Sequence, residues 1–415
     1  MFYWEMKKKY FVLMITLILS KSVVWGQTNI QKGTWRAAIL RDGHELPFGL
    51  EFQPHASGKT YRAWAINGSE RLEMDTAFVQ RDSLHIPMKM YDSDIVVRLK
   101  GNQMTGVWKK YRSAKEVVTL PFQATFGNFY LFNPAKKTAN ANLTGKWAAT
   151  FKSVDSGKET ATVGVFDQQG TKLTGTFLSS TGDYRYLAGD VVYDSLFLAC
   201  YDGSHAFLFK AKKQPDGSLK GGFWSGIAGY QTWTARPDPN AALPDATTLT
   251  YLKPGYETID FSFPDVNAKM VSLKDPRFKN KVTVVQIMGS WCPNCMDESN
   301  FLAPWYLKNQ KRGVEIVGLS FEKSDKLAES APKIQRMTNR LKITYPVLLA
   351  GKNDATASQS LPMLNKIMGY PTTIFIDKKG KVREIHTGFS GPGTGKYYDE
   401  FVEEFNRLID KMLRE

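Results

Sequence analysis

The chain has 415 residues, a length that suggests two or three domains. Its composition, with 42% hydrophobic and 23% charged residues, is that of a folded globular protein and excludes collagen, a coiled coil and a wholly disordered chain. Three cysteines are too few for a scaffold held together by disulfides. The net charge of +15 is compatible with acidic partners or a membrane surface. Basic and aromatic residues are not interleaved as in nucleic-acid-binding motifs, so we expect no nucleic-acid partner.

The first 26 residues have the pattern of a secretory signal peptide. Lys7, Lys8 and Lys9 precede an apolar run over residues 10–19, and small residues follow before Gln27. The apolar run is shorter than the roughly 17–25 residues that span a membrane. We therefore expect residues 1–26 to be a signal peptide cleaved near Gly26, and the mature protein to be periplasmic. An uncleaved membrane anchor is the alternative.

Residues 27–238 are predicted to form two tandem all-β modules. Short alternating runs of apolar and polar residues are separated by Gly, Asp-Gly and Asn-Gly turns. Gly33-Thr34-Trp35 recurs as Gly145-Lys146-Trp147, and Asp82-Ser83-Leu84 recurs as Asp194-Ser195-Leu196 at the same spacing. We expect module 1 over residues 27–134 and module 2 over residues 139–238, each a small barrel or sandwich.

Each module opens with a G-x-W motif, which resembles that of lipocalin-like barrels. Four tryptophans recur at related places: Trp35, Trp108, Trp147 and Trp224. We expect them to fill the module cores; the alternative is that they line a ligand cup or a docking surface. Cys200 has apolar neighbours and is predicted to be a buried free thiol.

A proline-rich stretch over residues 239–255 predicts a stiff, exposed linker. Beyond it, strands are expected to alternate with amphipathic helices, which is typical of an α/β sandwich. The expected strands are 281–288, 314–321, 343–349, 372–377 and 381–389. The expected helices are 292–310, 326–341, 359–368 and 396–413.

The sequence Trp291-Cys292-Pro293-Asn294-Cys295 follows a predicted buried strand and opens a predicted helix. At the helix start, the dipole and the unpaired N–H groups favour the thiolate of Cys292. Cys295 lies three residues later on the same face, so the two sulfurs can form a disulfide and exchange with another one. The alternatives are half of a zinc site or a structural disulfide. No other Cys or His stands at ligand spacing, so we expect no metal.

Residues 256–415 resemble the TlpA/ResA-like thiol–disulfide oxidoreductases of the thioredoxin-fold superfamily. Besides C-x-x-C, three segments carry the resemblance: Phe261-Ser262-Phe263-Pro264-Asp265, Gly369-Tyr370-Pro371-Thr372-Thr373 and Asp377-Lys378-Lys379-Gly380. They are similar to the family's first strand, its cis-proline loop and its hairpin turn. The resemblance implies a thioredoxin-like fold for residues 256–415.

The resemblance also implies roles for single residues. Pro371 is expected to follow a cis peptide bond and to leave the backbone of Tyr370 free to pair with an extended substrate segment. Trp291 and Pro293 are expected to contact the substrate with them. The family carries a glutamate where Glu298 stands, and a partly buried carboxyl there would have a raised pKa, as a proton carrier for the resolving thiol needs.

Two acidic positions near the site complete this prediction. Thioredoxin has a buried aspartate on the strand before its first cysteine, where this chain has Gln286. Glu298 is then the one evident proton relay; the alternative is a solvated acid in the first helical turn. Asp297 is expected to be such a solvated acid, which favours the helix dipole.

Two further motifs are expected to carry no chemistry. The glycine-rich stretch 391–396 departs from a phosphate-binding loop at Ser390 and Tyr397, so it is predicted to be a plain connection. His386 is predicted to be a packed or surface strand residue. No nicotinamide or flavin fingerprint occurs, so no cofactor is expected, and electrons would come from another protein's dithiol.

The sequence therefore predicts an exported thiol–disulfide oxidoreductase that reduces protein disulfides through Cys292 and Cys295. Its partners would be protein thiol or disulfide substrates and a membrane or periplasmic dithiol donor. Three alternatives stay open at this point. They are a disulfide oxidase or isomerase, a ligand-binding β-module protein with an accessory redox domain, and a thiol peroxidase, although the peroxidase pattern is absent before Cys292.

Overall fold

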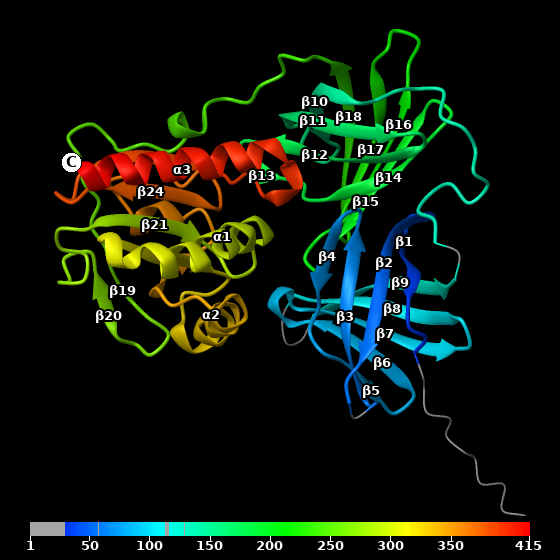
Figure 1. Ribbon diagram of the computed structural model, residues 1–415, viewed down its shortest axis with the longest axis horizontal. Coiled ribbons are helices and arrows are strands. Elements are labelled where there is room, and N and C mark those ends of the chain that lie inside the picture. Colours follow the sequence, from blue (N-terminus) through cyan, green and yellow to red (C-terminus); the bar gives the residue numbers. More distant parts are fainter. Residues whose placement is uncertain (1–29, 57, 113–115, 128) are drawn as a thin grey trace, which may run out of the picture.

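The computed structural model describes residues 30–56, 58–112, 116–127 and 129–415. The predicted signal peptide lies outside these residues. Within them, no helix is both long enough and apolar enough to cross a membrane. Figure 1 shows two β modules, coloured blue to green, beside a C-terminal α/β domain, coloured yellow-green to red.

Module 1 is a closed ring of eight strands. Its sheet runs in the order β2-β1-β9-β8-β7-β6-β5-β3-β4, and an additional pairing of β2 with β3 closes it. The β1–β2 turn shows how the sequence produces this meander: Asp42 and Gly43 both have positive φ, at 51° and 74°, as a tight hairpin between twisted strands requires. The strands are β1 (Thr34–Arg41), β2 (His44–Pro54), β3 (Thr60–Asn67), β4 (Glu70–Glu73), β5 (Ala77–Gln80), β6 (Ser83–Met88), β7 (Ser93–Lys100), β8 (Gln103–Tyr111) and β9 (Val117–Phe126).

Module 2 repeats this topology strand for strand, which confirms the tandem β modules predicted from the repeated motifs. Its order is β11-β10-β18-β17-β16-β15-β14-β12-β13, and β11 pairs with β12 to close the ring. The strands are β10 (Gly145–Ser153), β11 (Glu159–Gln169), β12 (Lys172–Ser179), β13 (Gly182–Asp183), β14 (Leu187–Val192), β15 (Ser195–Tyr201), β16 (Ala206–Lys213), β17 (Leu219–Ser225) and β18 (Gly229–Pro237).

The tryptophans mostly fill cores, as expected. Trp35, Trp108 and Trp147 are buried, whereas Trp224 is half-buried and packs against His44 and Tyr230. The interior of module 2 is filled by stacked and edge-on aromatic rings, which leaves the ligand-cup interpretation without support there. These rings are Phe151, Phe177, Phe209, Phe223 and Trp233.

The C-terminal domain is built on a five-stranded sheet in the order β23-β22-β21-β24-β25. The sheet is mixed: β22 pairs in parallel with β21 on one side and with β23 on the other, whereas β21 pairs with β24 in the antiparallel direction. Its strands are β21 (Val282–Met288), β22 (Val314–Glu322), β23 (Val347–Lys352), β24 (Thr372–Ile376) and β25 (Val382–Thr387), and a small hairpin precedes them, β19 (Ser262–Pro264) and β20 (Met270–Ser272). Its helices are α1 (Pro293–Asn309), α2 (Leu327–Leu341) and α3 (Lys396–Arg414).

The central strand β21 is buried along its whole length because both faces of the sheet are covered. Val282 and Val284 pack with side chains of the three helices. Val285 and Ile287, which point the other way, pack with residues from the segments 259–278 and 357–364. This is the thioredoxin-like α/β fold that the sequence predicted for the C-terminal domain.

Short 3-10 turns complete the secondary structure: η1 (Lys89–Tyr91), η2 (Ala246–Thr248), η3 (Gln310–Arg312), η4 (Ala357–Ser360) and η5 (Pro392–Thr394). The helix predicted over 359–368 is wrong, since only η4 forms there. Pro362 disfavours helical backbone at Leu361, and the side chain of Asn365 accepts a hydrogen bond from the backbone of Tyr251.

Two boundaries also differ from the sequence. The strand predicted over 343–349 starts only at Val347, after Pro346. The C-terminal domain begins to make contacts inside the predicted linker: Thr250 is fully buried and hydrogen bonds to Thr387, and Leu252 forms a bridge to Leu364.

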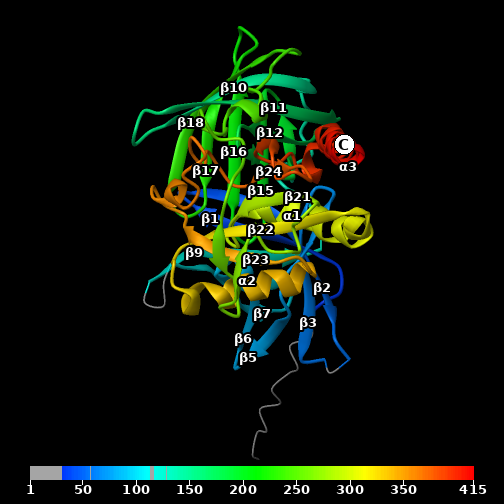
Figure 2. The same cartoon turned by 90° about the vertical axis from the view of Figure 1, so that its left-hand side faces the viewer.

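The three parts contact one another. Tyr201 and Leu208 of module 2 belong to the hydrophobic core of module 1. Figure 2 shows α2 beside module 1, where Arg336 donates a hydrogen bond to the carbonyl of Lys89 in η1 at 2.7 Å. The hairpin of β12 and β13 reaches the start of α1.

Candidate redox site

The two cysteines lie at the junction between the end of β21 and the start of α1. Cys292 is the N-cap of α1, and its Sγ accepts a hydrogen bond from the backbone N–H of Cys295 at 3.2 Å. Pro293 occupies the first helical position, where its missing N–H costs nothing. Both cysteines are free thiols; Cys292 is 6% exposed and Cys295 is fully buried. The helix-start geometry expected from the motif is therefore present.

Trp291 is fixed on one side of the pair. Its Nε1 donates to the carbonyl of Phe321 at 2.9 Å, and its ring stands edge-on to Tyr370 with centroids 5.5 Å apart. The loop has room for this arrangement because residue 289 is glycine: a Cβ there would lie 2.3 Å from the Trp291 Nε1. The indole thus forms one wall beside Cys292.

The loop before β24 forms the second wall. The peptide bond between Tyr370 and Pro371 is cis, as the resemblance implied. The Cys292 thiol donates to the Tyr370 carbonyl at 3.6 Å, so this loop lies against the sulfur. The four residues expected to contact a substrate, namely Trp291, Pro293, Tyr370 and Pro371, therefore lie together around Cys292; their contact with a substrate stays a prediction.

Glu298 lies beneath the sulfurs and is 1% exposed. Its Oε1 accepts a hydrogen bond from Thr373 Oγ1 at 2.5 Å, and its Oε2 accepts one from Gln286 Nε2 at 2.7 Å. Burial raises the pKa of Glu298 to about 7, although both hydrogen bonds oppose the rise because they favour the charged form. At neutral pH this carboxyl can both give and take a proton.

The two donors to Glu298 are cross-strand neighbours. Gln286 on β21 pairs in register with Thr373 on β24, and both are fully buried. Gln286 also accepts a hydrogen bond from Ser299 Oγ at 3.1 Å, which fixes the orientation of its amide. From the sequence, Gln286 was interpreted as the loss of a titratable acid. In the structure, its side chain hydrogen bonds to Glu298, the acid that remains, and holds it in place. The part played by Thr373 was missed; its place two residues after Pro371 was the only available signal.

Burial raises the pKa of the Cys295 thiol well above its usual range, and the neighbouring Cys292 and Glu298 raise it further. A thiol in this setting does not ionise readily without a base. Glu298, one helical turn after Cys295, is the carboxyl whose charge acts on this thiol. The site therefore combines an N-cap thiol, a deeply buried second thiol and a carboxyl that titrates near neutrality.

Asp297 is not the solvated acid that the sequence suggested. It forms an ion pair with Arg185, which comes from the loop after β13 of module 2. Burial raises the pKa of Asp297 to about 7, although the charge of Arg185 opposes the rise. A residue so far away in the chain could not have been recognised as a partner from local spacing.

The remaining candidates lie away from this chemistry. Cys200 is fully buried in the core of module 2, as predicted, and His386 packs edge-on to Phe401. Residues 391–396 form the connection through η5 to α3. In the described part of the chain, no three or more His, Cys, Asp or Glu residues are grouped so that they could hold a metal ion.

Parts of this chain are similar to known proteins. Residues 254–385 match the AhpC/TSA family. The thiol-disulfide oxidoreductase ResA of Geobacillus thermodenitrificans is 27% identical over 142 residues, which cover 34% of this chain and 74% of ResA. The thioredoxin-like protein YneN of Bacillus subtilis is 26% identical over 140 residues, which cover 33% of this chain and 73% of YneN.

A putative protein disulfide isomerase from Bacteroides thetaiotaomicron is a similar solved structure. It is 20% identical, and the alignment covers 40% of this chain and 93% of that one, with a TM-score of 0.30. The β modules lie outside the family match, which begins at residue 254. The C-terminal domain thus has a thioredoxin-like fold, matches the AhpC/TSA family over residues 254–385 and is similar to the ResA thiol–disulfide oxidoreductases.

Proposed function

We propose that the protein is exported and that its Cys292–Cys295 dithiol reduces disulfides in other proteins. The observation that carries the proposal is the arrangement of two free thiols over a buried carboxyl, at the start of α1 and against the cis-proline loop. Export is supported by the signal-like pattern of residues 1–26.

The reaction runs in two exchanges. The Cys292 thiolate attacks one sulfur of the substrate disulfide, the substrate S–S bond breaks, and a mixed disulfide to Cys292 forms. Glu298 then takes the proton of Cys295, whose thiolate attacks the Cys292 sulfur. The substrate sulfur that was bound to Cys292 leaves as a thiolate, and both it and the substrate thiolate released in the first exchange are protonated. Two electrons have passed to the substrate, and Cys292 and Cys295 are joined by a disulfide.

Another protein's dithiol would return the domain to its reduced form by the reverse exchanges. The direction is supported by the residues between the cysteines. Pro293 and Asn294 include no histidine, the residue that would stabilise a thiolate next to the pair and favour oxidation of substrates.

The proposal is tested by insulin-disulfide reduction with the full chain and dithiothreitol as the electron source. We expect faster precipitation of the insulin chains with the wild type than with Cys292→Ser. Cys200→Ala serves as the control, since it removes a thiol buried in module 2. Equal rates for the wild type and Cys292→Ser would reject a reductase function.

A further inference from the structure

The face of the C-terminal domain that surrounds Cys292 is in contact with module 2. The contacting segment is the turn between β12 and β13 together with β13 itself, residues 180–183, which we name the hairpin tip. It touches three separate loops. These are the C-x-x-C loop at Asn294, the cis-proline loop at Gly369 and the loop after β25 at Gly388.

The contacts are close at each of the three places. A Cβ at Gly182 would lie 2.0 Å from Asn294 Nδ2, and a Cβ at Gly369 would lie 2.4 Å from the Thr181 side chain. A Cβ at Gly388 would lie 3.0–3.1 Å from the backbone of the tip. Glycines on both sides of the contact therefore let the backbones approach.

These three loops belong to one surface around the reactive sulfur. Asn294 stands between the two cysteines, and Gly369 directly precedes Tyr370, whose carbonyl contacts Cys292 Sγ. Gly388 donates a backbone hydrogen bond to the carbonyl of Pro371 at 2.8 Å. A substrate disulfide must bring a sulfur to about 3–3.5 Å from Cys292 Sγ in order to react. A polypeptide that carries this disulfide needs the surface that the tip occupies.

Polar contacts hold the tip in place. Gly391 donates to Asp183 Oδ2 at 2.7 Å, and Asn294 Nδ2 donates to the Asp183 carbonyl at 3.3 Å. Just beyond the tip, the buried Arg185 pairs with Asp297 of α1 and, at 2.7 Å, with Glu70 of module 1. Charged and polar groups of this kind regain hydration when they separate, so the contact can open at a lower cost than an apolar core.

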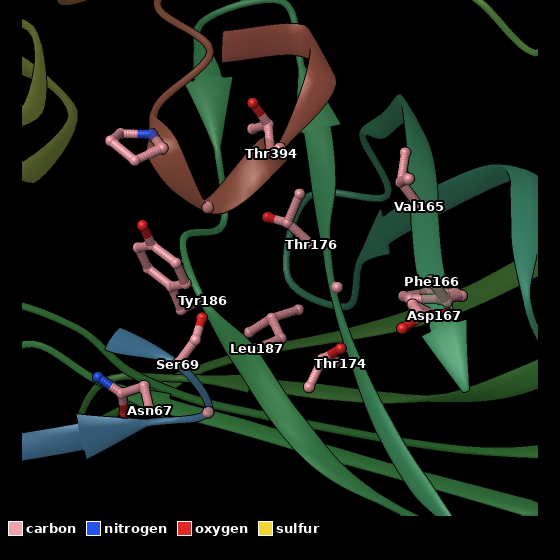
Figure 3. A pocket seen from close by; sticks show the side chains of 15 residues that line it. Asn67, Ser69, Val165, Phe166, Asp167, Thr174, Thr176, Tyr186, Leu187 and Thr394 are labelled. Carbon is pink, nitrogen blue, oxygen red and sulfur yellow. The ribbon is translucent and has the colours of Figure 1, made fainter. Parts of the chain in front are cut away.

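The junction is also incompletely packed. A cavity of about 370 Å³ lies beside the hairpin, where the three parts of the chain meet. Figure 3 shows Asn67 and Ser69 of module 1, Thr174 and Thr176 of β12, and Thr394 of η5 around it. Its lining mixes these polar side chains with apolar ones such as Phe166 and Leu187.

We propose that the hairpin tip is an intramolecular cover over the Cys292 surface, and that a protein disulfide must displace it before it can react. The proposal rests on the proposed reductase function. Small disulfides would need only the narrow access beside Cys292, whereas polypeptides would need the tip to move away. The reactivity toward polypeptides is then reduced by the fraction of molecules in which the tip is closed.

The first test is Thr181→Tyr in the full chain. A tyrosine cannot fit against Gly369, so the tip is pushed away from the surface. Ser156→Tyr, an exposed position in the loop between β10 and β11, is the matched control. The measured quantities are the second-order rate constants of the reduced proteins with oxidised insulin and with a small aromatic disulfide.

We expect Thr181→Tyr to raise the rate constant with insulin about tenfold or more, as expected when a mostly closed state becomes open. The rate with the small disulfide should change little, and Ser156→Tyr should match the wild type with both. An unchanged or lower rate constant with insulin in folded Thr181→Tyr would refute the proposal that the hairpin tip covers the Cys292 surface. If neither protein reacts with insulin while both react with the small disulfide, the reductase function fails as well.

A second measurement needs no tip variant. Hydrogen exchange of residues 180–185 is compared between the free Cys295→Ser protein and its mixed disulfide with an insulin chain, which forms when the Cys292 thiolate attacks a disulfide of oxidised insulin. We expect faster exchange in the mixed disulfide, because the tip must leave. Unchanged protection of the tip with the polypeptide attached to Cys292 would contradict the proposal even if Thr181→Tyr does not fold.

Discussion

Glu298→Gln tests the proton-carrying role of the buried carboxyl. The substitution keeps the size of the side chain and removes its ability to take a proton from Cys295. Gln286 Nε2 can still donate to the carbonyl of the new amide, and the amide NH2 can donate to Thr373 Oγ1, so we expect the fold to persist. The resolving step should slow by roughly 10²-fold at neutral pH, within the usual range of general acid–base help.

The same variant has a consequence for stability. The pKa of Glu298 rises from its ordinary value of 4.5 to about 7 in the fold. At about 1.4 kcal/mol for each tenfold change in proton affinity, this rise corresponds to about 3 kcal/mol. Because the folded pKa is the higher one, this contribution to stability is present below pH 4.5 and is lost as the pH rises through 7. Glu298→Gln should therefore gain stability relative to the wild type by up to about 3 kcal/mol between these pH values.

Resolution can be followed directly by stopped-flow absorbance. A mixed disulfide of Cys292 with thionitrobenzoate is formed on one protein molecule, and Cys295 then releases the coloured thiolate. The rate difference between Glu298→Gln and the wild type should shrink as the pH rises, because hydroxide replaces the missing base. Glu329→Gln, a substitution on the exposed face of α2, is the control. Release at the wild-type rate by Glu298→Gln at pH 7 would refute the reasoning.

Three further predictions concern single side chains. Cys292→Ser should abolish disulfide exchange, and Cys295→Ser should accumulate mixed disulfides that are visible by mass spectrometry; equal turnover of both with the wild type would contradict their roles. Cys200→Ala should leave turnover unchanged, and a large rate loss in the folded variant would contradict the expectation that Cys200 takes no part in turnover. Thr373→Val removes a hydrogen bond that favours the charged form of Glu298, so the midpoint of the pH–rate profile should move up by about one pH unit; a midpoint that stays in place or falls would contradict this assignment.

The cysteine pair could be predicted from the sequence because its geometry is local. Cys295 lies three positions after Cys292, and one turn of α1 brings both sulfurs to the same side. The burial of Glu298 follows from the same helical spacing. By contrast, its contact with Thr373 depends on the register of β24 against β21, which no local pattern reveals.

The repeated β modules could also be predicted, because turn residues and the alternation of apolar and polar residues are local signals. The predicted helix over 359–368 failed because Pro362 and the contacts of Asn365 with the linker overrode a weak periodicity. The ion pair of Arg185 with Asp297 joins module 2 to the C-terminal domain, and no local pattern in either segment of the sequence predicts it. The contact between the domains could therefore not be predicted from the sequence.

The most direct test of the central claim is the reduction potential of the Cys292–Cys295 pair. The full chain is equilibrated with glutathione redox buffers, alkylated and analysed by mass spectrometry. We predict a single two-electron transition at a potential more negative than about −200 mV, closer to thioredoxin than to strongly oxidising enzymes. A pair that forms no disulfide, or a potential near −120 mV as in a strong oxidant, would contradict a protein-disulfide reductase.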